Sequence, residues 1–515
     1  MFWRKAGFRW QIVAEKAPAV DPHAQPNLQV SISYLSGSLR SYRFLLMFFS
    51  KLPYILYRDY PDFGYLTDNR NYGYDTASKS CLKTGDRILS KTGSVFYSVL
   101  TEKTQSTLEI AEKLLHLFHD VTLSELERDA KEFFLELSRD GFVRCGKDVD
   151  SLASANYFSY TNRSPYELTS VDNSFENTAF SVNWGSDYHL SRIHVDVSGL
   201  CNEHCVHCYI PDKFRNRTMS EDLFQVILDQ SKACQVLNIT ISGGEPMLNP
   251  NLLAFIRGCW DSNFSINLLS NLTLLTDEMI HEFEKAPLLS IQTSLYSMIE
   301  EVHDSITQSH GSFAKTKRAI EMLHQHNIPM QINCPIMKQN KDTYQDVLDW
   351  AKSMNIESSS DFMLFGRFDG SCKNLQCRLE ISDVEAIIRK ERKSDKVNTE
   401  KHAPGASICP VLTNSICISH TGDIYPCEGW QSYVLGNIRT SSLSKIWNES
   451  PDVQKLRALT YDDFPKCRTC DKKDFCSICL IRNVNESKRL DYKDVNPYFC
   501  EVARIKKRMA KNCGR

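Results

Sequence analysis

The sequence has no charge excess of either sign, because 61 Lys and Arg are matched by 63 Asp and Glu, for a formal net charge of −2. General nucleic-acid binders and proteins of anionic membrane surfaces carry a basic excess, so we expect no nucleic-acid and no membrane partner. The sequence also lacks a long hydrophobic run. Its most apolar stretch, 44–57, is broken by Lys51 and Pro53 and is shorter than the ~20 residues that span a bilayer.

Cysteine, in contrast, is abundant, with 19 residues among 515. Cysteines at this density indicate disulfides, metal binding or redox chemistry. The first residues lack the apolar core and the cleavage site of a signal peptide, so we expect a cytoplasmic chain with reduced thiols. The cysteines are therefore expected to bind metal or to lie buried as small apolar residues.

The chain is long enough for about three domains. Composition and cysteine distribution divide it into an N-terminal extension without a clear pattern, a compact unit, a polar linker rich in Ser, Asn, Thr and Tyr, an α/β region and a cysteine-rich end. The boundaries that we expect are 1–84, 85–150, 151–187, 188–370 and 371–515.

The compact unit at 85–150 has the pattern of a small winged helix. Strand-like pieces at Asp86–Leu89 and Val95–Leu100 precede two amphipathic helices. Thr107 is the expected cap of the first helix, and the second begins at Ser124 and ends at Gly141, a residue suited to a helix C-terminus.

Between 190 and 365, strand-like and helical patterns alternate. The expected strands are Ile193–Val197, Leu237–Ile241, Ser265–Leu269, Leu289–Leu295, Met330–Ile336 and Phe362–Phe365. Helical patterns between them include Ser220–Cys234, Asn251–Trp260, Ser312–His326 and Thr343–Met354. Six such repeats predict an α/β fold in which a parallel sheet with helices outside forms a partial (βα)6 TIM-like barrel. Such enzymes place their chemistry at the carboxyl ends of the strands.

A cysteine motif follows the first expected strand. Cys201-x3-Cys205-x2-Cys208 supplies three thiolates within eight residues, with Tyr209 next. Three thiolates can hold three irons of a [4Fe–4S] cluster and leave the fourth iron open to an outside ligand. A zinc site without its fourth ligand is the alternative reading.

Small and polar residues end the next strands. Gly243, Gly244 and Glu245 follow the second strand, and paired glycines let a backbone edge approach a small ligand closely. Ser270 and Asn271 end the third strand and Ser294 ends the fourth, where they could reach a ribose or a carboxylate, although Ser and Asn are also common turn residues.

Together, Cys-x3-Cys-x2-Cys and Gly-Gly-Glu-Pro resemble the radical S-adenosylmethionine (radical SAM) superfamily over about residues 190–365. The resemblance implies that the cysteine motif ligates a [4Fe–4S] cluster, that SAM chelates the open iron, and that its cleavage gives a 5′-deoxyadenosyl radical. It places Gly243, Gly244 and Glu245 along the methionine moiety of SAM. Further implied contacts are Ser270, Asn271, Ser294 and Tyr209.

The C-terminal cysteines resemble the SPASM extension of that superfamily. The resemblance implies two auxiliary [4Fe–4S] clusters, and so three clusters in all. The first would be held by Cys409, Cys427 and Cys479, and the second by Cys467, Cys470, Cys476 and Cys500. Residues 467–479 alone would also suit a zinc site. Because 378–408 contain no cysteine, we expect the first auxiliary cluster to have an open iron, unless Cys372, Cys377 or Cys417 joins it; Cys417 is expected to pack in the core.

The unit at 85–150 resembles the leader-peptide recognition element of enzymes that modify ribosomally made peptides. Its 9 Lys and Arg against 11 Asp and Glu in 86–147 disfavour DNA binding. In that family the precursor's leader adds as a strand to the edge of the domain's sheet.

These resemblances predict a radical SAM peptide maturase of the sactipeptide or ranthipeptide type, most simply one that forms a Cys thioether crosslink. An electron donor such as flavodoxin or ferredoxin is then required. Carbon–carbon crosslinking, epimerisation and formylglycine formation of the sulfatase-maturase kind are alternatives, as are a non-catalytic iron–sulfur or zinc peptide scaffold and a DNA-binding sensor.

Other polar residues follow the expected strands or lie in the cysteine loop. His303 and Asp304 suit a surface loop better than proton transfer, and His204 and His207 are not assigned as ligands. We expect three residues after the sixth strand to lie near the substrate mouth: Arg367, Asp369 and Arg378.

Overall fold

The computed structural model describes residues 2–6, 9–13, 47–69, 85–149, 152, 188–286, 289–391, 408–409, 411–476 and 478–511. The chain divides into two compact units, one made of 1–71 and 82–181 and the other of 72–81 and 182–515. Almost all of the predicted linker 151–187 lies outside the described residues. No helix in the described part of the chain is long and apolar enough to cross a membrane.

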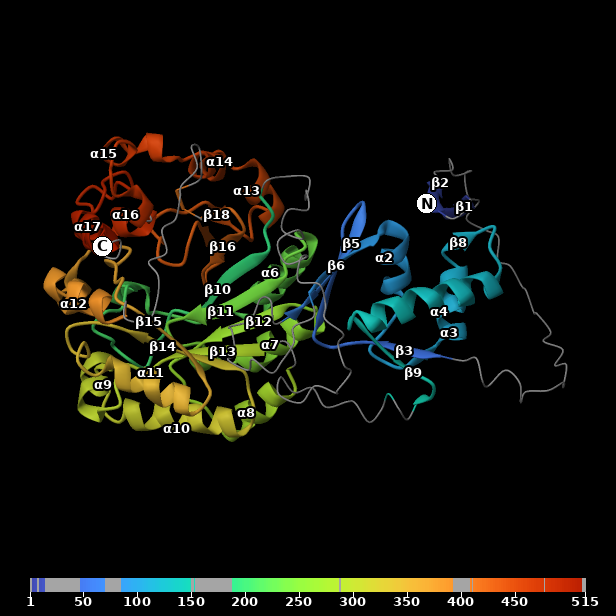
Figure 1. The fold of residues 1–515 in the computed structure, drawn as a ribbon, viewed down its shortest axis with the longest axis horizontal. Coiled ribbons are helices and arrows are strands. Elements are labelled where there is room, and N and C mark those ends of the chain that lie inside the picture. The colour runs from blue at the N-terminus through green and yellow to red at the C-terminus, as the bar shows by residue number, and fades with distance from the viewer. Residues whose placement is uncertain are drawn as a thin grey trace. The chain divides into compact units, whose positions relative to one another are not determined.

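In its described residues, the first unit combines short, mostly antiparallel sheets with three helices (Figure 1). Its elements are β1 (Phe2–Ala6), β2 (Arg9–Val13), β3 (Phe48–Lys51), β4 (Ile55–Asp59), β5 (Phe63–Asp68), β6 (Asp86–Ser90), α2 (Lys91–Ser98), β7 (Gln105–Ser106), α3 (Thr107–Leu115), β8 (Phe118–His119), α4 (Leu123–Arg139) and β9 (Val143–Gly146). Three sheets form, with strand orders β2-β1-β8, β7-β3-β9 and β4-β5-β6. Strands β3 to β5 thus come from a stretch to which the sequence assigned no pattern.

Both predicted helices of this unit are present, with caps one or two residues earlier than expected. Ser106, not Thr107, caps α3, and Thr122 caps α4, each in a reciprocal box with a glutamate three residues on. Gly141 follows α4 with a φ of 82°, the left-handed conformation that its lack of a Cβ permits.

The predicted strand Val95–Leu100 is wrong, because Lys91–Ser98 forms helix α2. The Ser90 hydroxyl accepts a hydrogen bond from the Gly93 N–H and so caps the helix. Phe96 and Tyr97 are buried from this helix in the core of the unit. Tertiary packing here overrides the strand preference of β-branched and aromatic residues.

The second unit is built on a nine-stranded sheet with the order β15-β14-β13-β12-β11-β10-β16-β17-β18. The parallel strands are β10 (Arg192–Ser198), β11 (Asn238–Gly243), β12 (Ser265–Leu269), β13 (Leu289–Ser294), β14 (Met330–Pro335) and β15 (Glu357–Asp361). The helices between them are α6 (Glu221–Ala233), α7 (Leu252–Asp261), α8 (Asp277–Glu284), α9 (Glu300–Thr307), α10 (Ser312–Gln325) and α11 (Tyr344–Ser353). The mixed α/β fold with a parallel sheet is confirmed (Figure 1).

The C-terminal region extends this sheet at its β10 edge. Strand β16 (Ser415–Ile418) pairs parallel to β10, and β17 (Asp423–Tyr425) and β18 (Gly436–Asn437) continue in antiparallel fashion. Helix α12 (Ile381–Glu391) precedes these three strands. The helices after them are α13 (Leu443–Glu449), α14 (Pro451–Arg457), α15 (Pro465–Arg468), α16 (Leu480–Glu486) and α17 (Pro497–Lys511).

The sixth strand differs from its prediction. Strand β15 is Glu357–Asp361, whereas the apolar run Phe362–Phe365 directly follows it. Phe362 and Leu364 are buried in apolar clusters beyond the strand end and take no part in the ladder. The strand itself is polar, so it carried no apolar signal.

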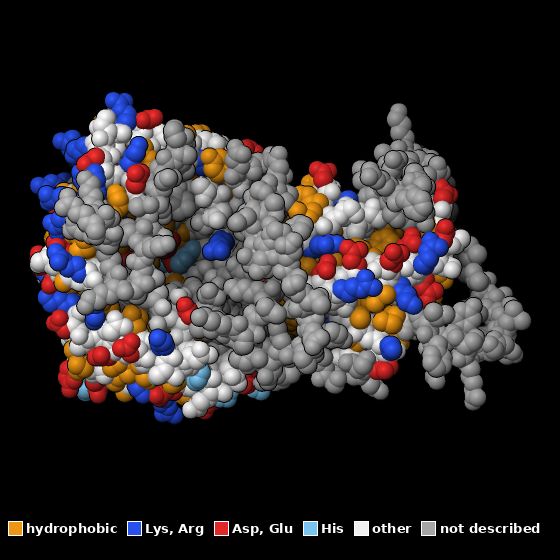
Figure 2. Space-filling model, in the orientation of Figure 1, with side chains coloured by type: hydrophobic (Ala, Val, Ile, Leu, Met, Phe, Trp, Pro, Cys, Tyr) orange, Lys and Arg blue, Asp and Glu red, His pale blue; other side chains and the backbone are white. Residues whose placement is uncertain are grey.

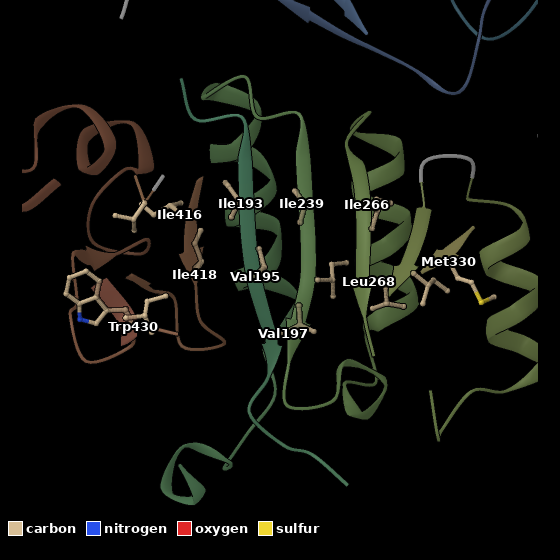
Figure 3. Packing of buried hydrophobic residues seen from close by; sticks show 14 of the residues in the cluster. Ile193, Val195, Val197, Ile239, Ile266, Leu268, Met330, Ile416, Ile418 and Trp430 are labelled. Carbon is tan, nitrogen blue, oxygen red and sulfur yellow. The ribbon is translucent and has the colours of Figure 1, made fainter. Parts of the chain in front are cut away.

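The sheet has one apolar and one polar face. Ile193, Val195 and Val197 of β10 belong to the large apolar core, and Figure 3 shows them beside Ile239 and Ile266 of the next strands. Because side chains alternate along a strand, the residues between them face the other way. That second face, here called the inner face, carries His194, Asp196, Thr240, Ser242, Asn267, Gln292, Ser294, Gln331, Asn333 and Cys417.

Candidate functional site

The cysteine motif lies in the loop directly after β10, at the carboxyl ends of the parallel strands. The loop is anchored to the end of α9, because the His204 and Val206 N–H groups donate to the Thr307 and Ile306 carbonyls at 3.0 and 2.9 Å. Burial raises the pKa of the Cys205 thiol well above its usual range, and nearby charge, including that of Cys208 and Cys201, raises it further. The three thiols of the loop therefore interact electrostatically with one another.

Two charged side chains that the sequence analysis missed support this loop. Arg215 donates to the Glu203 carbonyl at 2.7 Å and hydrogen-bonds Cys208, which places a cation beside the thiols. The Glu203 carboxylate is 3% exposed, accepts from the Ser312 hydroxyl and lies 3.5 Å from the Cys205 sulfur. Only their position within the motif loop could have drawn attention to these residues.

The paired glycines lie against the backbone that leads into the cysteine loop. A Cβ on Gly243 would be 2.2 Å from the Ser198 oxygen, and one on Gly244 would be 2.3 Å from the Leu200 oxygen. The Gly244 and Glu245 N–H groups donate to these same two carbonyls, each at 2.7 Å. Glycine is therefore required at these two positions because they pack against the backbone of 198–200, whether or not a ligand is also bound there.

Glu245 is fully buried and connects the ends of β11 and β12. Its carboxylate accepts from the Met247 N–H at 2.9 Å, the Ser270 hydroxyl at 2.8 Å and the Asn271 N–H at 2.8 Å. Burial raises the pKa of Glu245 to about 7, although these hydrogen bonds act in the opposite direction. The Asn271 side chain donates in turn to the Asn202 amide oxygen of the cysteine loop at 3.0 Å.

His303 was wrongly expected in a surface loop, because it lies on α9 and is 1% exposed. It accepts from the Tyr296 N–H at 3.3 Å, and the Tyr296 hydroxyl lies 3.3 Å from His207 of the cysteine loop. Burial lowers the pKa of His303 to about 4, so it is neutral. Asp304 caps α10 by accepting from backbone N–H groups, and Ser294 hydrogen-bonds Tyr296.

Electrostatic interactions link the C-terminal cysteines in two sets, and their assignment to two clusters stays a prediction. Burial raises the pKa of Cys409 to about 11 and that of Cys427 well above its usual range, and the charge of Cys479 adds to both. Burial likewise raises the pKa of Cys467 to about 11, and its thiol neighbours form the second group: Cys476, Cys500 and Cys470.

The three extra cysteines differ in their surroundings, and Cys417 interacts electrostatically with Cys427 of the first group. Cys372 is exposed, and the Cys377 thiol contacts the Asn374 carbonyl at 2.9 Å. Cys417 is fully buried, as expected, but its thiol lies on the inner face within 4.8 Å of ligand atoms of His194 and Asp196. It therefore has polar neighbours, and an open first auxiliary iron remains a prediction.

Among the residues placed near the substrate mouth, Arg378 is already engaged. It forms a largely buried ion pair with Glu486 and donates to the Leu364 carbonyl at 2.5 Å. Arg367 lies 3.8 Å from Asp212 of the cysteine loop. Asp369 accepts from the Ser371 N–H at 3.1 Å.

The inner-face pair His194 and Asp196 was missed in the sequence. The His194 Nε2 atom lies 3.1 Å from the Asp196 carboxylate. The signal was present, because these two polar residues alternate with Ile193, Val195 and Val197 and must therefore face away from the helices.

Comparison with protein families agrees with both cysteine regions. Residues 195–351 match the model of the radical SAM superfamily, and residues 409–471 match that of SPASM, an iron–sulfur cluster-binding domain.

Individual relatives are distant. An AdoMet-dependent heme synthase of Methanosarcina barkeri is 25% identical over 59% of this chain and 94% of its own length. The antilisterial bacteriocin subtilosin biosynthesis protein AlbA of Bacillus subtilis is 27% identical over 57% of this chain and 68% of its own. The crystal structure of Streptococcus suis SuiB bound to precursor peptide SuiA shares the fold, with a TM-score of 0.55, 14% identity and coverage of 88% of this chain and 99% of that one.

Proposed function

Because the chain carries a radical SAM domain followed by a SPASM domain, it is a radical SAM enzyme, and we propose that it modifies a ribosomally made peptide. The observation that carries this proposal is the cysteine loop at the edge of a polar sheet face, a surface rich in Asn, Gln and Ser that suits peptide groups. A bacteriocin biosynthesis protein and a precursor-bound enzyme among the relatives support it.

The described residues fit SAM and iron–sulfur clusters. We assign the SAM-binding cluster to Cys201, Cys205 and Cys208, whose loop is fixed by Arg215 and by the end of α9. SAM bound there supplies a 5′-deoxyadenosyl radical that removes a hydrogen atom from the substrate. The two further thiol groups support two auxiliary clusters, and so three in total.

The first unit supports leader binding at the edge of the β4-β5-β6 sheet. In the described residues β6 pairs only with β5, so its other side is open to an added strand. Ile88 of β6 is 41% exposed, and the neighbouring Arg87 side chain is paired with Glu136 and Asp140 of α4. We propose that this unit is a winged-helix recognition element and that the leader pairs with β6.

Leader binding predicts a specific effect of charge at β6. Ile88→Glu should weaken peptide binding at least tenfold, because the added strand would bury a charge. Leu108→Glu on α3 is the matched control, since Leu108 is similarly exposed at 38% but lies away from the edge. Fluorescence anisotropy with labelled precursor measures the affinity of both variants. If Ile88→Glu binds the precursor as tightly as Leu108→Glu does, the assignment of β6 is contradicted.

A basic region around the second auxiliary group suits an acidic electron donor such as flavodoxin or ferredoxin. Figure 2 shows Lys and Arg side chains gathered where Figure 1 places α15 and α17. Lys466, Arg468 and Lys473 are exposed beside these cysteines. Charge reversal at all three should slow SAM cleavage driven by flavodoxin but not by dithionite, since only a protein donor must dock.

We propose a thioether crosslink as the product. The decisive experiment is anaerobic coexpression with each short open reading frame beside the gene, followed by mass spectrometry. Loss of two hydrogens together with one iodoacetamide-reactive thiol indicates a thioether, whereas the same loss with all thiols intact indicates a carbon–carbon bond. Cys201→Ala should abolish the change.

Other products give other signatures. An aldehyde that reacts with hydrazine would indicate formylglycine, and inversion of an α-carbon at constant mass would indicate epimerisation. An enzyme that cleaves SAM but leaves every peptide unmodified would refute the peptide assignment. Thiolate ligands of iron–sulfur clusters must be reduced, which supports action in the reducing cytoplasm.

A further inference from the structure

A hydrogen-bonded histidine and carboxylate lie on the inner face beside a buried thiol. His194 Nε2 is 3.1 Å from Asp196 Oδ1, and the Gln431 side-chain amide donates to Asp196 Oδ2 at 2.6 Å. Ligand atoms of His194, Asp196 and Cys417 all lie within 4.8 Å of one another. Asp196 is 5% exposed and Cys417 is fully buried. Gln431 and Asp196 thus fix the orientation of the imidazole.

The residues around this pair interact with both the SAM-cluster motif and the first auxiliary group. The Tyr209 phenol interacts electrostatically with Asp196, with Cys417 and with Cys208 of the SAM-cluster motif. Cys417 interacts in the same way with Cys427 of the first auxiliary group. The pair therefore lies near both groups.

One nitrogen of the imidazole is available for a substrate. Nε2 is occupied by Asp196, and Nδ1 of His194 has no partner among the described residues. A base oriented by a carboxylate through its other ring nitrogen is a recurring arrangement for proton transfer. The function proposed above leaves this role open, because removal of a hydrogen atom from carbon does not remove the proton of the attacking thiol.

We propose that His194, oriented by Asp196 and Gln431, is the base that takes the proton from the substrate cysteine thiol before the carbon–sulfur bond forms. This inference rests on the proposed function. In the step the S–H bond breaks, its electron pair stays on sulfur, and the proton moves to Nδ1. No electron changes hands, so the step needs neither oxidant nor reductant.

The charges around His194 suit this task. Burial lowers its pKa, but the hydrogen bond and charge of Asp196 and the charge of Glu428 outweigh burial and leave the pKa above its ordinary value. A base with a raised pKa is better matched to a thiol, whose ordinary pKa is about 8.5. The other titratable groups near the pair are Cys417, Tyr209, His420 and Tyr425.

The test separates hydrogen-atom abstraction from crosslinking. The probe is the precursor found by coexpression, expressed in deuterated medium, with the reconstituted full-length enzyme. Deuterium in 5′-deoxyadenosine reports abstraction, and crosslinked peptide reports product. We compare the parent with His194→Gln, Asp196→Asn and the control His326→Gln. His326 forms a similar pair with Glu284 on the outer surface, at 2.8 Å.

His194→Gln should keep deuterium transfer within about twofold but lower crosslinking about 100-fold at pH 7. Its crosslinking should recover above about pH 8.5, where the thiol ionises unaided. In Asp196→Asn, the rise of crosslinking with pH should begin at lower pH than in the parent, because the carboxylate that raises the His194 pKa is gone. His326→Gln should match the parent.

Three results would overturn the inference. Parallel losses of deuterium transfer and product without recovery at high pH would mean that the pair only maintains structure. Stoichiometric zinc that is bound by the parent and absent from His194→Gln would mean that His194, Asp196 and Cys417 form a metal site. Unchanged crosslinking in His194→Gln would exclude a base. Absence of deuterium transfer in the parent, in contrast, would refute the proposed function itself.

Discussion

Gly244→Ala is the substitution whose effect can be worked out most directly. The added Cβ would be 2.3 Å from the Leu200 carbonyl oxygen, and real Cβ contacts are not closer than 3.0 Å. The neighbouring atom is backbone, so the two segments must separate by at least the difference. Leu200 directly precedes Cys201, and the shift therefore reaches the first thiol of the cluster loop.

The magnitude follows from the hydrogen bonds that join the segments. Gly244 N–H donates to the Ser198 carbonyl and Glu245 N–H to the Leu200 carbonyl, both at 2.7 Å. At about 1 kcal/mol each, their loss destabilises the fold by about 2 kcal/mol, before any strain. We also expect the chain to lose about four irons, since a displaced Cys201 no longer completes the SAM-binding cluster.

Gly258→Ala is the matched control. A Cβ there would meet only the Leu228 Cδ1 atom at 2.9 Å, the end of a flexible side chain. Gly258 lies in α7, where alanine is favoured over glycine by about 1 kcal/mol. Thermal unfolding and iron analysis of both reconstituted variants form the assay. If Gly244→Ala retains its iron, its melting temperature and SAM cleavage, the assignment of Gly244 to loop packing is refuted.

Three further predictions concern buried or capping side chains. Glu245→Gln should gain stability relative to the parent as pH rises. The folded-state pKa of about 7 lies above the ordinary 4.5, so the parent loses about 3 kcal/mol between those values. About 2 kcal/mol of this loss falls between pH 5.5 and 8, and urea unfolding at these two pH values measures it. Arg378→Met should cost about 3–5 kcal/mol in the same assay, because it leaves Glu486 shielded and unpaired. Thr122→Ala should cost about 1 kcal/mol by removing the cap of α4, measured by helical ellipticity on heating; an unchanged transition in any of the three would contradict its reasoning.

Much of the sheet could be predicted from the sequence, because apolar residues fill one face of each strand. Strand β12 occupies the predicted residues Ser265–Leu269, because Ile266 and Leu268 face the apolar core with polar Asn267 between them. Strand β15 has no such run, and Phe362–Phe365 gave a false strand signal just after it. Helix α2 was missed because its β-branched and aromatic residues pack from a helix once the rest of the unit is formed.

The grouping of the motif cysteines could be expected from the sequence, whereas the residues that support their loop could not. Spacing alone identifies Cys201, Cys205 and Cys208 as a group, since three thiolates so close in sequence must be close in space. Arg215 and Glu203 reach the thiols through folding of the loop, which no local pattern encodes. A polar residue such as His303 gives no sign in sequence that it will be buried.

The measurement that tests the central claim most directly is SAM cleavage by the anaerobically reconstituted, reduced full-length chain, with iron counted in the same sample. The account predicts 5′-deoxyadenosine and about twelve irons per chain, as three [4Fe–4S] clusters require. Cys201→Ala should abolish the nucleoside and remove about four irons. Bound zinc with no SAM cleavage would contradict the account, and about eight irons with cleavage intact would contradict the assignment of one auxiliary group.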